Sequence, residues 1–299
     1  MTHSPSVVYR TLGADQQWGY RALTFPALGH LLDRLDDVDV MALGADDAAG
    51  KPLGLALGVE ANGEDGARRA QLLSLYVEPA SRRNGIAAGL LGAFTDLCRG
   101  RGCAEISATY MSGQPTTAGL ERLLASAEWT QPETRMLVVH ATLDSIRPAP
   151  WMRSYPMADN MQIVDWLDLT QADRAEIAES QFREPWIPPD LYPFDHESNC
   201  EPVTSLALKV DGRIVGWTIN HRVGSVLRYT CSFMHRRLQR MGRILLLYNE
   251  AVARMPQAGL DTGMWTVPVW HPGMAAFARR WMAPYATRFD ETRGTKRVL

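Results

Sequence analysis

The stretch that decides the fold is Leu75-Tyr-Val-Glu-Pro-Ala-Ser-Arg-Arg-Asn-Gly-Ile-Ala87. It starts inside the apolar run Gln71–Val77, which predicts a strand, and it ends where apolar residues begin to recur at helical spacing. A helix start presents main-chain N–H groups without internal acceptors, and its dipole favours negative charge. Gly85 and the small Ala87 allow a pyrophosphate to approach the backbone, and two neighbouring arginines add positive charge. The stretch therefore predicts a phosphate-binding loop between a strand and a helix.

The order of predicted elements around this loop occurs twice along the chain. The first half contains strands at Val7–Tyr9, Pro52–Val59, Gln71–Val77, Glu105–Tyr110 and Met136–His140, with helices at about Ser81–Arg99 and Thr117–Ala127. The second half contains strands at Met161–Leu167, Ser205–Val210, Ile214–Asn220 and Val226–Phe233, a helix at Gln171–Gln181 and another that begins near Arg240. The marker residues Gly85 and Gly242 lie 242 − 85 = 157 residues apart. A single internal duplication explains this spacing.

These elements predict an α/β fold with two domains, each a twisted mixed sheet flanked by helices. We expect a first domain at residues 1–145, a linker at 146–160 that is rich in Pro, Trp and Met, and a second domain at 161–299. The Asp211-Gly212 pair between two alternating apolar runs predicts a tight hairpin in the second domain.

Composition excludes several classes of function. Lys and Arg total 31 against 33 for Asp and Glu, so the net charge of -2 indicates no binding to nucleic acid or to an anionic membrane. The chain has no apolar run long enough to span a membrane, and its N-terminus does not resemble a secretory signal, so we expect a cytoplasmic protein. The 4 cysteines are not spaced as a metal site, and we expect no metal.

The pattern Val77-x-Pro79-x-x-Arg82-x-x-Gly85-x-Ala87 resembles the acyl-CoA-binding signature of the GCN5-related N-acetyltransferase (GNAT) superfamily. The resemblance is strongest from Pro52 to His140. It implies a sheet whose fourth and fifth strands splay apart, with the pantetheine arm of acetyl-CoA, or of a longer acyl-CoA, in the gap. The cofactor-binding residues that it implies are Leu75, Tyr76, Val77, Arg82, Arg83, Asn84, Gly85, Ile86 and Ala87.

The second half departs from that signature. Aligned on the helical stripe, Arg237 takes the arginine position, Arg240 the first glycine position and Gly242 the second small position, and no proline precedes them. Downstream, His271 stands where the family has asparagine. The resemblance therefore implies a degenerate second copy that has lost acyl-CoA binding and shapes the acceptor site.

The reaction implied is attack of a neutral amine on a thioester, which needs a base for the amine and an acid for the leaving thiolate. The family's tyrosine acid falls on Leu124 and its asparagine on Thr117, so the usual acid is missing. Tyr110 and Tyr76 are the alternative acids. Glu60, Glu78 and Glu105 are the candidate bases, and catalysis by positioning alone is an open alternative.

The segment Arg183–Glu197 is a proline-rich aromatic loop with titratable groups, and it is the candidate acceptor site or else a cover over the second core. Its candidate substrate residues are Trp186, Tyr192, Asp195, His196 and Glu197. The leading hypothesis is an acyl-CoA-dependent N-acyltransferase acting on the primary amine of a small molecule or peptide. The alternatives are a non-catalytic acyl-CoA sensor and an antibiotic-modifying acetyltransferase.

Overall fold

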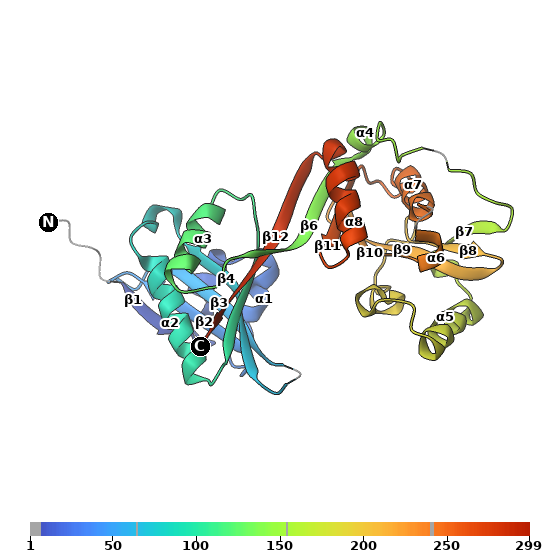
Figure 1. The fold of residues 1–299 in the computed structure, drawn as a ribbon. Coiled ribbons are helices and arrows are strands. Elements are labelled where there is room, and N and C mark those ends of the chain that lie inside the picture. Colours follow the sequence, from blue (N-terminus) through green and yellow to red (C-terminus); the bar gives the residue numbers. More distant parts are fainter. Residues whose placement is uncertain (1–6, 64, 154, 240–241) are drawn as a thin grey trace. The chain divides into compact units, whose positions relative to one another are not determined.

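The computed structural model describes residues 7–63, 65–153, 155–239 and 242–299, which form two compact units (Figure 1). The first unit comprises Met1–Thr134 together with Thr292–Leu299, and the second comprises Arg135–Glu291. The chain therefore leaves the first unit once and returns to it at its C-terminal end. The expected boundaries of 1–145, 146–160 and 161–299 differ from these units because they include no such return.

The first unit is built on a mixed sheet with the strand order β1-β2-β3-β4-β5-β12. Its strands are β1 (Val8–Thr11), β2 (Val40–Asp46), β3 (Pro52–Asn62), β4 (Arg68–Val77), β5 (Glu105–Met111) and the second part of β12 (Arg288–Val298). Its helices are α1 (Gly29–Leu32), α2 (Ile86–Gly100) and α3 (Thr117–Ser126), with short 3-10 helices η1 (Gln17–Leu23), η2 (Pro26–Leu28) and η3 (Pro79–Ser81). Neighbouring strands are antiparallel except β4 and β5, which run parallel.

Helices cover both faces of this sheet. On one face α2 and α3 enclose a core that includes Leu90 and Phe94, and on the other η1 and α1 enclose a core that includes Tyr20 and Leu32 (Figure 1). Every residue of β2 is consequently buried. A strand buried on both sides lacks the alternation that marks a half-exposed strand, which explains why sequence patterning does not reveal β2.

The second unit has the strand order β6-β11-β10-β9-β8-β7. Its strands are β6 (Glu133–Thr142) from Arg135 onward, β7 (Met161–Asp165), β8 (Leu206–Val210), β9 (Arg213–Val223), β10 (Val226–Met234) and β11 (Thr262–Pro268). Its α-helices are α4 (Leu143–Ile146), α5 (Gln171–Arg183), α6 (Arg236–Gln239), α7 (Ile244–Arg254) and α8 (Pro272–Phe277), and the turns of helix between them are η4 (Trp166–Asp168), η5 (Pro189–Leu191), η6 (Pro193–Asp195), η7 (Ala278–Met282) and η8 (Ala283–Tyr285).

The predicted hairpin of the second unit is confirmed. β8 and β9 pair antiparallel up to Val210 and Arg213, and the two residues between them, Asp211 and Gly212, have φ angles of 51° and 78°. Two successive positive φ angles are the requirement of the two-residue hairpin turn whose twist matches that of the strands.

The last strand of each unit comes from an unexpected part of the chain. Met136–His140, expected to close the first unit, lies in β6 and pairs with β11 of the second unit, so that expectation is wrong. The closing strand of the first unit is the C-terminal segment Thr292–Val298, which pairs antiparallel with β5. This segment is rich in charged and polar residues and has no apolar alternation, so its sequence does not predict a strand.

The internal duplication is confirmed by the spacing of corresponding elements. Adding 157 to the bounds of β5, 105–111, reproduces those of β11, 262–268. Each unit also pairs these strands in parallel with a preceding long strand, β4 or β10. The two units are therefore built to one plan.

Candidate functional site

The gap between β4 and β5 is the central feature of the first unit. The two strands pair in parallel only from Arg69↔Glu105 to Leu72↔Ala108, after which β4 continues to Val77 and β5 to Met111 without pairing to each other. The opening coincides with an irregularity in the β3–β4 ladder, where Leu73 has no partner on β3. Such a bulge leaves an extra residue and increases the local twist, which turns the rest of β4 away from β5.

The predicted phosphate-binding loop follows directly from the splayed end of β4. Pro79–Ser81 form the short helix η3, residues 82–85 form a turn, and α2 begins at Ile86 rather than at the expected Ser81. The later start has a physical cause, because Gly85 has φ 78° and Arg83 has φ 66°, values incompatible with a right-handed helix.

The loop is held open by its own side chains. Arg82 Nε donates a hydrogen bond to the carbonyl oxygen of Val77 at 2.9 Å, and its guanidinium carbon lies 5.6 Å from the ring centroid of Tyr76. Asn84 Nδ2 donates to the carbonyl oxygen of Ser81 at 3.3 Å. These bonds tie both ends of the turn to β4 and η3 and keep its main chain exposed.

The N-terminus of α2 is suited to an anion. The N–H of Gly89 bonds to the carbonyl oxygen of Gly85 at 3.0 Å, so the N–H groups of residues 86–88 precede the first turn of main-chain bonds. A Cβ placed on Gly85 would meet no atom within 4 Å, which shows that space is open above the loop. A phosphate in that space would face the positive end of the helix dipole and the exposed Arg83.

The second unit repeats this construction. β10 and β11 pair in parallel only from Val226↔Thr262 to Tyr229↔Trp265, and Thr230 then has no partner on β9. The residues that lie 157 positions after Val77, Arg82 and Gly85 are Met234, Gln239 and Gly242. Gln239 Nε2 donates to the carbonyl oxygen of Met234 at 2.8 Å, as Arg82 does to Val77, and Gly242 has φ 63°.

This register corrects the alignment expected from the helical stripe. Gly242 corresponds to the first glycine, Gly85, and Gln239 rather than Arg237 takes the arginine position. Arg240, expected at the first glycine position, lies outside the described residues. The second copy still departs from the first, since Arg236 replaces Pro79 and the branched Ile244 replaces Ala87.

The three carboxylates proposed as bases lie at different ends of the sheet. Glu78 follows β4 at the loop and is 3.5 Å from Lys51. Glu60 pairs with Ala70 of β4. Because Ala70 precedes Val77 by seven residues, strand geometry places Glu60 on the order of 20 Å from the loop. Glu60 contacts Arg68 and Arg101, and Glu105 contacts Lys296 at 2.8 Å. Only Glu78 lies at the splayed end.

The two tyrosines proposed as acids both lie beyond the last parallel pair. Tyr76 is on β4 beside Arg82. Tyr110 is on β5, and its hydroxyl donates to Oε1 of Glu121 on α3 at 3.0 Å. Burial, reinforced by this bond, raises the pKa of Tyr110 above its usual value. Leu124, at the position of the family's tyrosine, is fully buried in the core under α3.

Two residues near Tyr110 were not identified from the sequence. Glu121 lies one turn before Leu124 on α3, and Arg293 of β12 donates to the same Oε1 atom at 2.8 Å. Arg293 is also the direct cross-strand partner of Tyr110. No motif relates residues 183 positions apart, so only the pairing of β12 with β5 reveals this group.

The candidate acceptor residues lie in the second unit, where most of them have structural contacts. Trp186 packs 5.9 Å from Trp217, and Tyr192 packs 5.3 Å from Phe194, between ring centroids. Glu197 forms an ion pair with Arg174 and accepts a hydrogen bond from Trp166. His196 bonds to the carbonyl oxygen of Asp190, and Asp195 is exposed. These contacts describe a cover over the second core.

His271, which we expect at the family's asparagine position, is the N-cap of α8. Its Nε2 lies 2.7 Å from Oδ2 of Asp190, which also accepts from Nε1 of Trp270 at 3.0 Å. Although burial acts in the opposite direction, these hydrogen bonds lower the pKa of Asp190. The pair ties the turn η5 to the start of α8.

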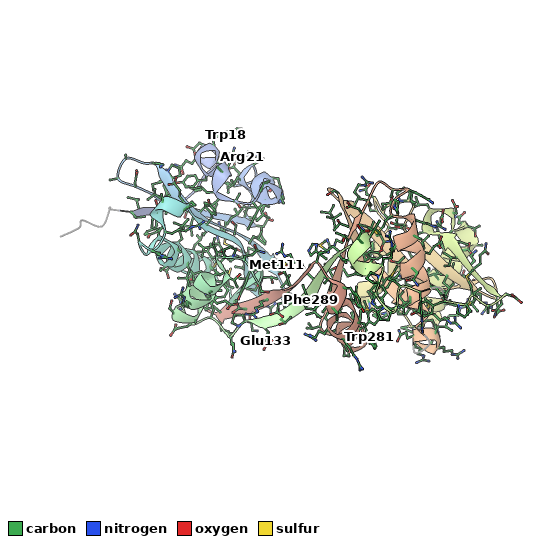
Figure 2. The ribbon with its side chains drawn as sticks, turned by 90° about the horizontal axis from the view of Figure 1, so that it is seen from above. Trp18, Arg21, Met111, Glu133, Trp281 and Phe289 are labelled. Carbon is green, nitrogen blue, oxygen red and sulfur yellow. The ribbon has the colours of Figure 1, made fainter. Side chains whose placement is uncertain are left out.

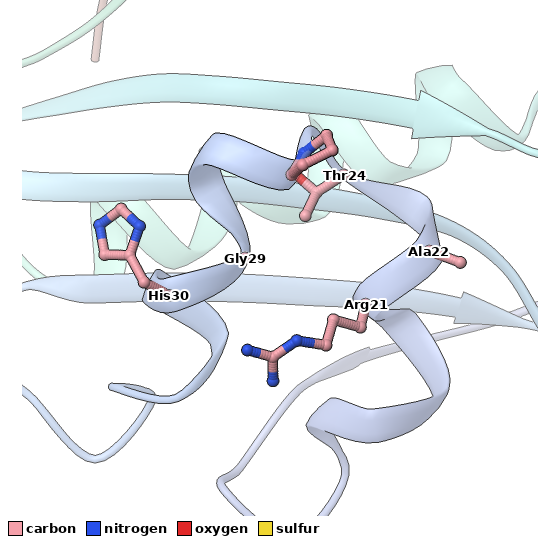
Figure 3. A pocket seen from close by; sticks show the side chains of 6 residues that line it. Arg21, Ala22, Thr24, Gly29 and His30 are labelled. Atoms are coloured by element: carbon pink, nitrogen blue, oxygen red, sulfur yellow. The ribbon is translucent and has the colours of Figure 1, made fainter. Parts of the chain in front are cut away.

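A pocket of about 590 Å³ lies on the face of the first unit opposite α2. It is lined by Arg21, Ala22, Thr24, Pro26, Gly29 and His30 (Figure 3). Arg21 is engaged with Asp33 by two hydrogen bonds of 2.7 Å, and the nearby Trp18 is largely exposed (Figure 2). This pocket contains none of the residues predicted from the sequence.

Comparison with known families identifies the first unit. Residues 8–123 match the family model described as "Acetyltransferase (GNAT) family". None of the curated proteins matches the chain by sequence. Of the helices in the described part of the chain, none has the length and apolar character needed to cross a membrane.

Solved structures share the fold of the whole chain at low identity. A GCN5-related N-acetyltransferase from Sphaerobacter thermophilus is 14% identical with a TM-score of 0.60, and the match covers 97% of this chain and 95% of that one. A tandem GNAT protein from the clavulanic acid biosynthesis pathway is 15% identical with a TM-score of 0.59, covering 98% of both chains.

A third structure is the glucosamine N-acetyltransferase region of a fungal multi-domain beta-N-acetylglucosaminidase, at 13% identity and a TM-score of 0.63. This chain is covered over 98% of its length but spans only 38% of that protein. At these identities the likeness concerns the fold, and the fold is that of a tandem GNAT protein.

Proposed function

Because residues 8–123 match the GNAT family model, we propose that the chain is an acyl-CoA-dependent N-acyltransferase. It moves an acetyl or longer acyl group from CoA to the primary amine of a small molecule or a peptide. The family match and the tandem fold support the coarser statement, N-acetyltransferase. The observation that carries the proposal is the open, left-handed turn at Gly85, which lies between the splayed end of β4 and the N-terminus of α2.

The first unit offers a continuous path for the cofactor. Main-chain N–H groups from Arg83 to Ala87 would bind the pyrophosphate at the helix start. Main-chain groups of Leu75 and Val77, on the part of β4 that has no parallel partner, would bind the pantetheine arm in the gap. The thioester would then lie between β4 and β5, with its carbonyl oxygen near a main-chain N–H that stabilises the oxyanion.

The chemistry needs one proton removed from the amine and one delivered to the thiolate. Of the carboxylates considered, Glu78 is the remaining candidate base because it lies at the splayed end, with Lys51 as its neighbour. Tyr110 is the candidate acid, since Leu124 cannot supply a proton. Positioning of the amine against the thioester supplies a further part of the rate.

We assign the cofactor to the first unit. The second unit keeps the glycine turn, but Ile244 adds a branched side chain where the first unit has Ala87, and Arg236 removes the proline that shapes the entry. The larger side chain of Ile244 narrows the approach of a pyrophosphate to the helix start, and without the proline the turn that precedes it is less constrained. We therefore propose that the second unit holds no second donor site.

The test is an assay of thiol release from acetyl-CoA in the presence of a panel of small amines, polyamines, aminoglycosides and peptides. Turnover that depends on the amine supports the proposal, and the amine that turns over best identifies the acceptor. Binding of acetyl-CoA without turnover of any amine would instead identify a non-catalytic acyl-CoA sensor. Turnover restricted to aminoglycosides would identify an antibiotic-modifying enzyme.

A further inference from the structure

The C-terminal strand β12 places a charged side chain beside Tyr110, on the edge of β5 that faces away from β4. Tyr110 lies two residues past Ala108, the last β5 residue that pairs with β4, so it is on the wall of the gap. Its side chain packs in the same apolar cluster as Leu75 and Val77, on the face covered by α2 and α3. Arg293 stands directly opposite Tyr110 on β12.

Tyr110 and Arg293 share one acceptor atom. The tyrosine hydroxyl donates to Oε1 of Glu121 at 3.0 Å, and Arg293 Nη1 donates to the same oxygen at 2.8 Å. An acceptor that loses its only donor in a partly buried site carries a penalty, but Glu121 keeps the charged donor when the phenol turns away. Arg293 therefore allows Tyr110 to release its hydrogen bond.

We propose that Glu121 and Arg293 are positioning residues: they orient Tyr110 at the wall of the gap and let its hydroxyl turn from Glu121 to the leaving sulfur of CoA, to which it donates its proton. The inference rests on the proposed acyl transfer. The amine nitrogen forms the C–N bond, the C–S bond breaks, and the thiolate takes the phenolic proton. The proton lost by the amine passes through the base and solvent and restores the phenol. The end of the chain thus completes a site formed by residues 68–126.

The experiment measures this contact without an acceptor amine. Calorimetry at pH 9 compares CoA with desulfo-CoA, in which hydrogen replaces the thiol. At this pH a thiol of ordinary pKa is largely ionised, while the raised pKa keeps Tyr110 protonated. We expect the wild type to bind CoA about tenfold more tightly than desulfo-CoA, as one charged hydrogen bond allows.

The variants separate positioning from general stability. Tyr110→Phe is expected to bring the affinity ratio to about 1, and Arg293→Met to reduce it at least about threefold, while Arg293→Lys restores it. Arg297→Met is the matched control, because Arg297 lies on the same strand in an ion pair with Glu128, away from Tyr110. It should leave the ratio unchanged.

With the amine that turns over best in the panel assay as acceptor, Tyr110→Phe should lower kcat about 100-fold at an unchanged KM for acetyl-CoA. If Tyr110→Phe leaves the ratio of CoA affinity to desulfo-CoA affinity unchanged, the inference is overturned while the proposed function stays intact. Equal weakening of both ligands by Arg293→Met and by Arg297→Met shows a structural role only, and it also overturns the inference. A wild type that binds neither ligand overturns the proposed function as well.

Discussion

Tyr20 on η1 is almost fully buried, and its hydroxyl donates a hydrogen bond to the buried carboxylate of Asp46. Arg10 forms an ion pair with the same carboxylate at 2.7 Å. Burial, together with the bond to Asp46, raises the pKa of Tyr20 to about 12. The group fixes the segment that covers one face of the first sheet.

This group predicts a stability change at high pH. The folded state holds the Tyr20 proton more tightly than the unfolded chain does, so its stabilisation is complete below about pH 10 and is lost as the pH rises to about 12. We expect the melting temperature of the wild type to fall more steeply over this range than that of Tyr20→Phe. Parallel curves for the two proteins would show that Tyr20 titrates as it does when unfolded.

The sequence predicts single residues of the loop between β4 and α2, but it does not predict which groups their side chains hydrogen-bond. Gly85 and Arg82 are identified by their spacing, because a turn with positive φ and a nearby cation suit a phosphate. The bond from Arg82 to Val77 and the group formed by Tyr110, Glu121 and Arg293 depend on how strands pair. The spacing of residues along the sequence does not indicate which strands pair.

Individual elements follow the sequence closely where their pattern is strong. The sequence predicts a helix at Thr117–Ala127, and α3 spans Thr117–Ser126 with Leu124 of its apolar stripe buried in the core. β2 and β12 were missed, the first because it is buried throughout and the second because it is polar. Patterning therefore predicts an element most readily where it has one apolar face.

Leu124 provides a test at this scale. Leu124→Tyr introduces the residue type that the resemblance implies at this position, but the larger ring and its hydroxyl would enter a packed core, so we expect a loss of about 2 kcal/mol or more in the free energy of unfolding. Leu124→Met is the control of similar volume and should lose less. Chemical denaturation measures both. A Leu124→Tyr variant as stable as wild type and faster in turnover would place this position at the reacting sulfur.

The molecule as a whole is organised by the return of its C-terminal end. Thr295 Oγ1 donates to the carbonyl oxygen of Thr130 at 2.6 Å, and Lys296 N–H donates to Thr130 Oγ1 at 3.1 Å, besides the ladder that joins β12 to β5. The duplication was predictable from the 157-residue spacing. The sequence does not predict the exchange of closing strands, in which β12 rather than β6 closes the sheet of the first unit beside β5. Either strand could offer main-chain hydrogen-bonding groups to β5.

The exchange predicts which fragments fold. Residues 1–134 alone lack the closing strand and should aggregate or remain unfolded, because the β5 edge is exposed. Since Thr130 lies beside Thr295 and Lys296, Thr134 and Thr292 lie near each other in the first unit. Joining residues 1–134 to 292–299 through Asn-Gly should therefore give a soluble, cooperatively melting unit. Circular dichroism of both fragments checks this, and equal folding of the two would show that β12 is dispensable.

The central claim is that the turn at Gly85 holds the acyl-CoA and the corresponding turn at Gly242 does not. Calorimetry with acetyl-CoA should compare the wild type with Gly85→Asp and Gly242→Asp. Aspartate tolerates positive φ better than most residues and adds a negative charge where the phosphate would lie. We predict one site in the wild type, affinity at least about 100-fold weaker in Gly85→Asp, and wild-type affinity in Gly242→Asp. Wild-type affinity in Gly85→Asp, with loss in Gly242→Asp, would contradict the account.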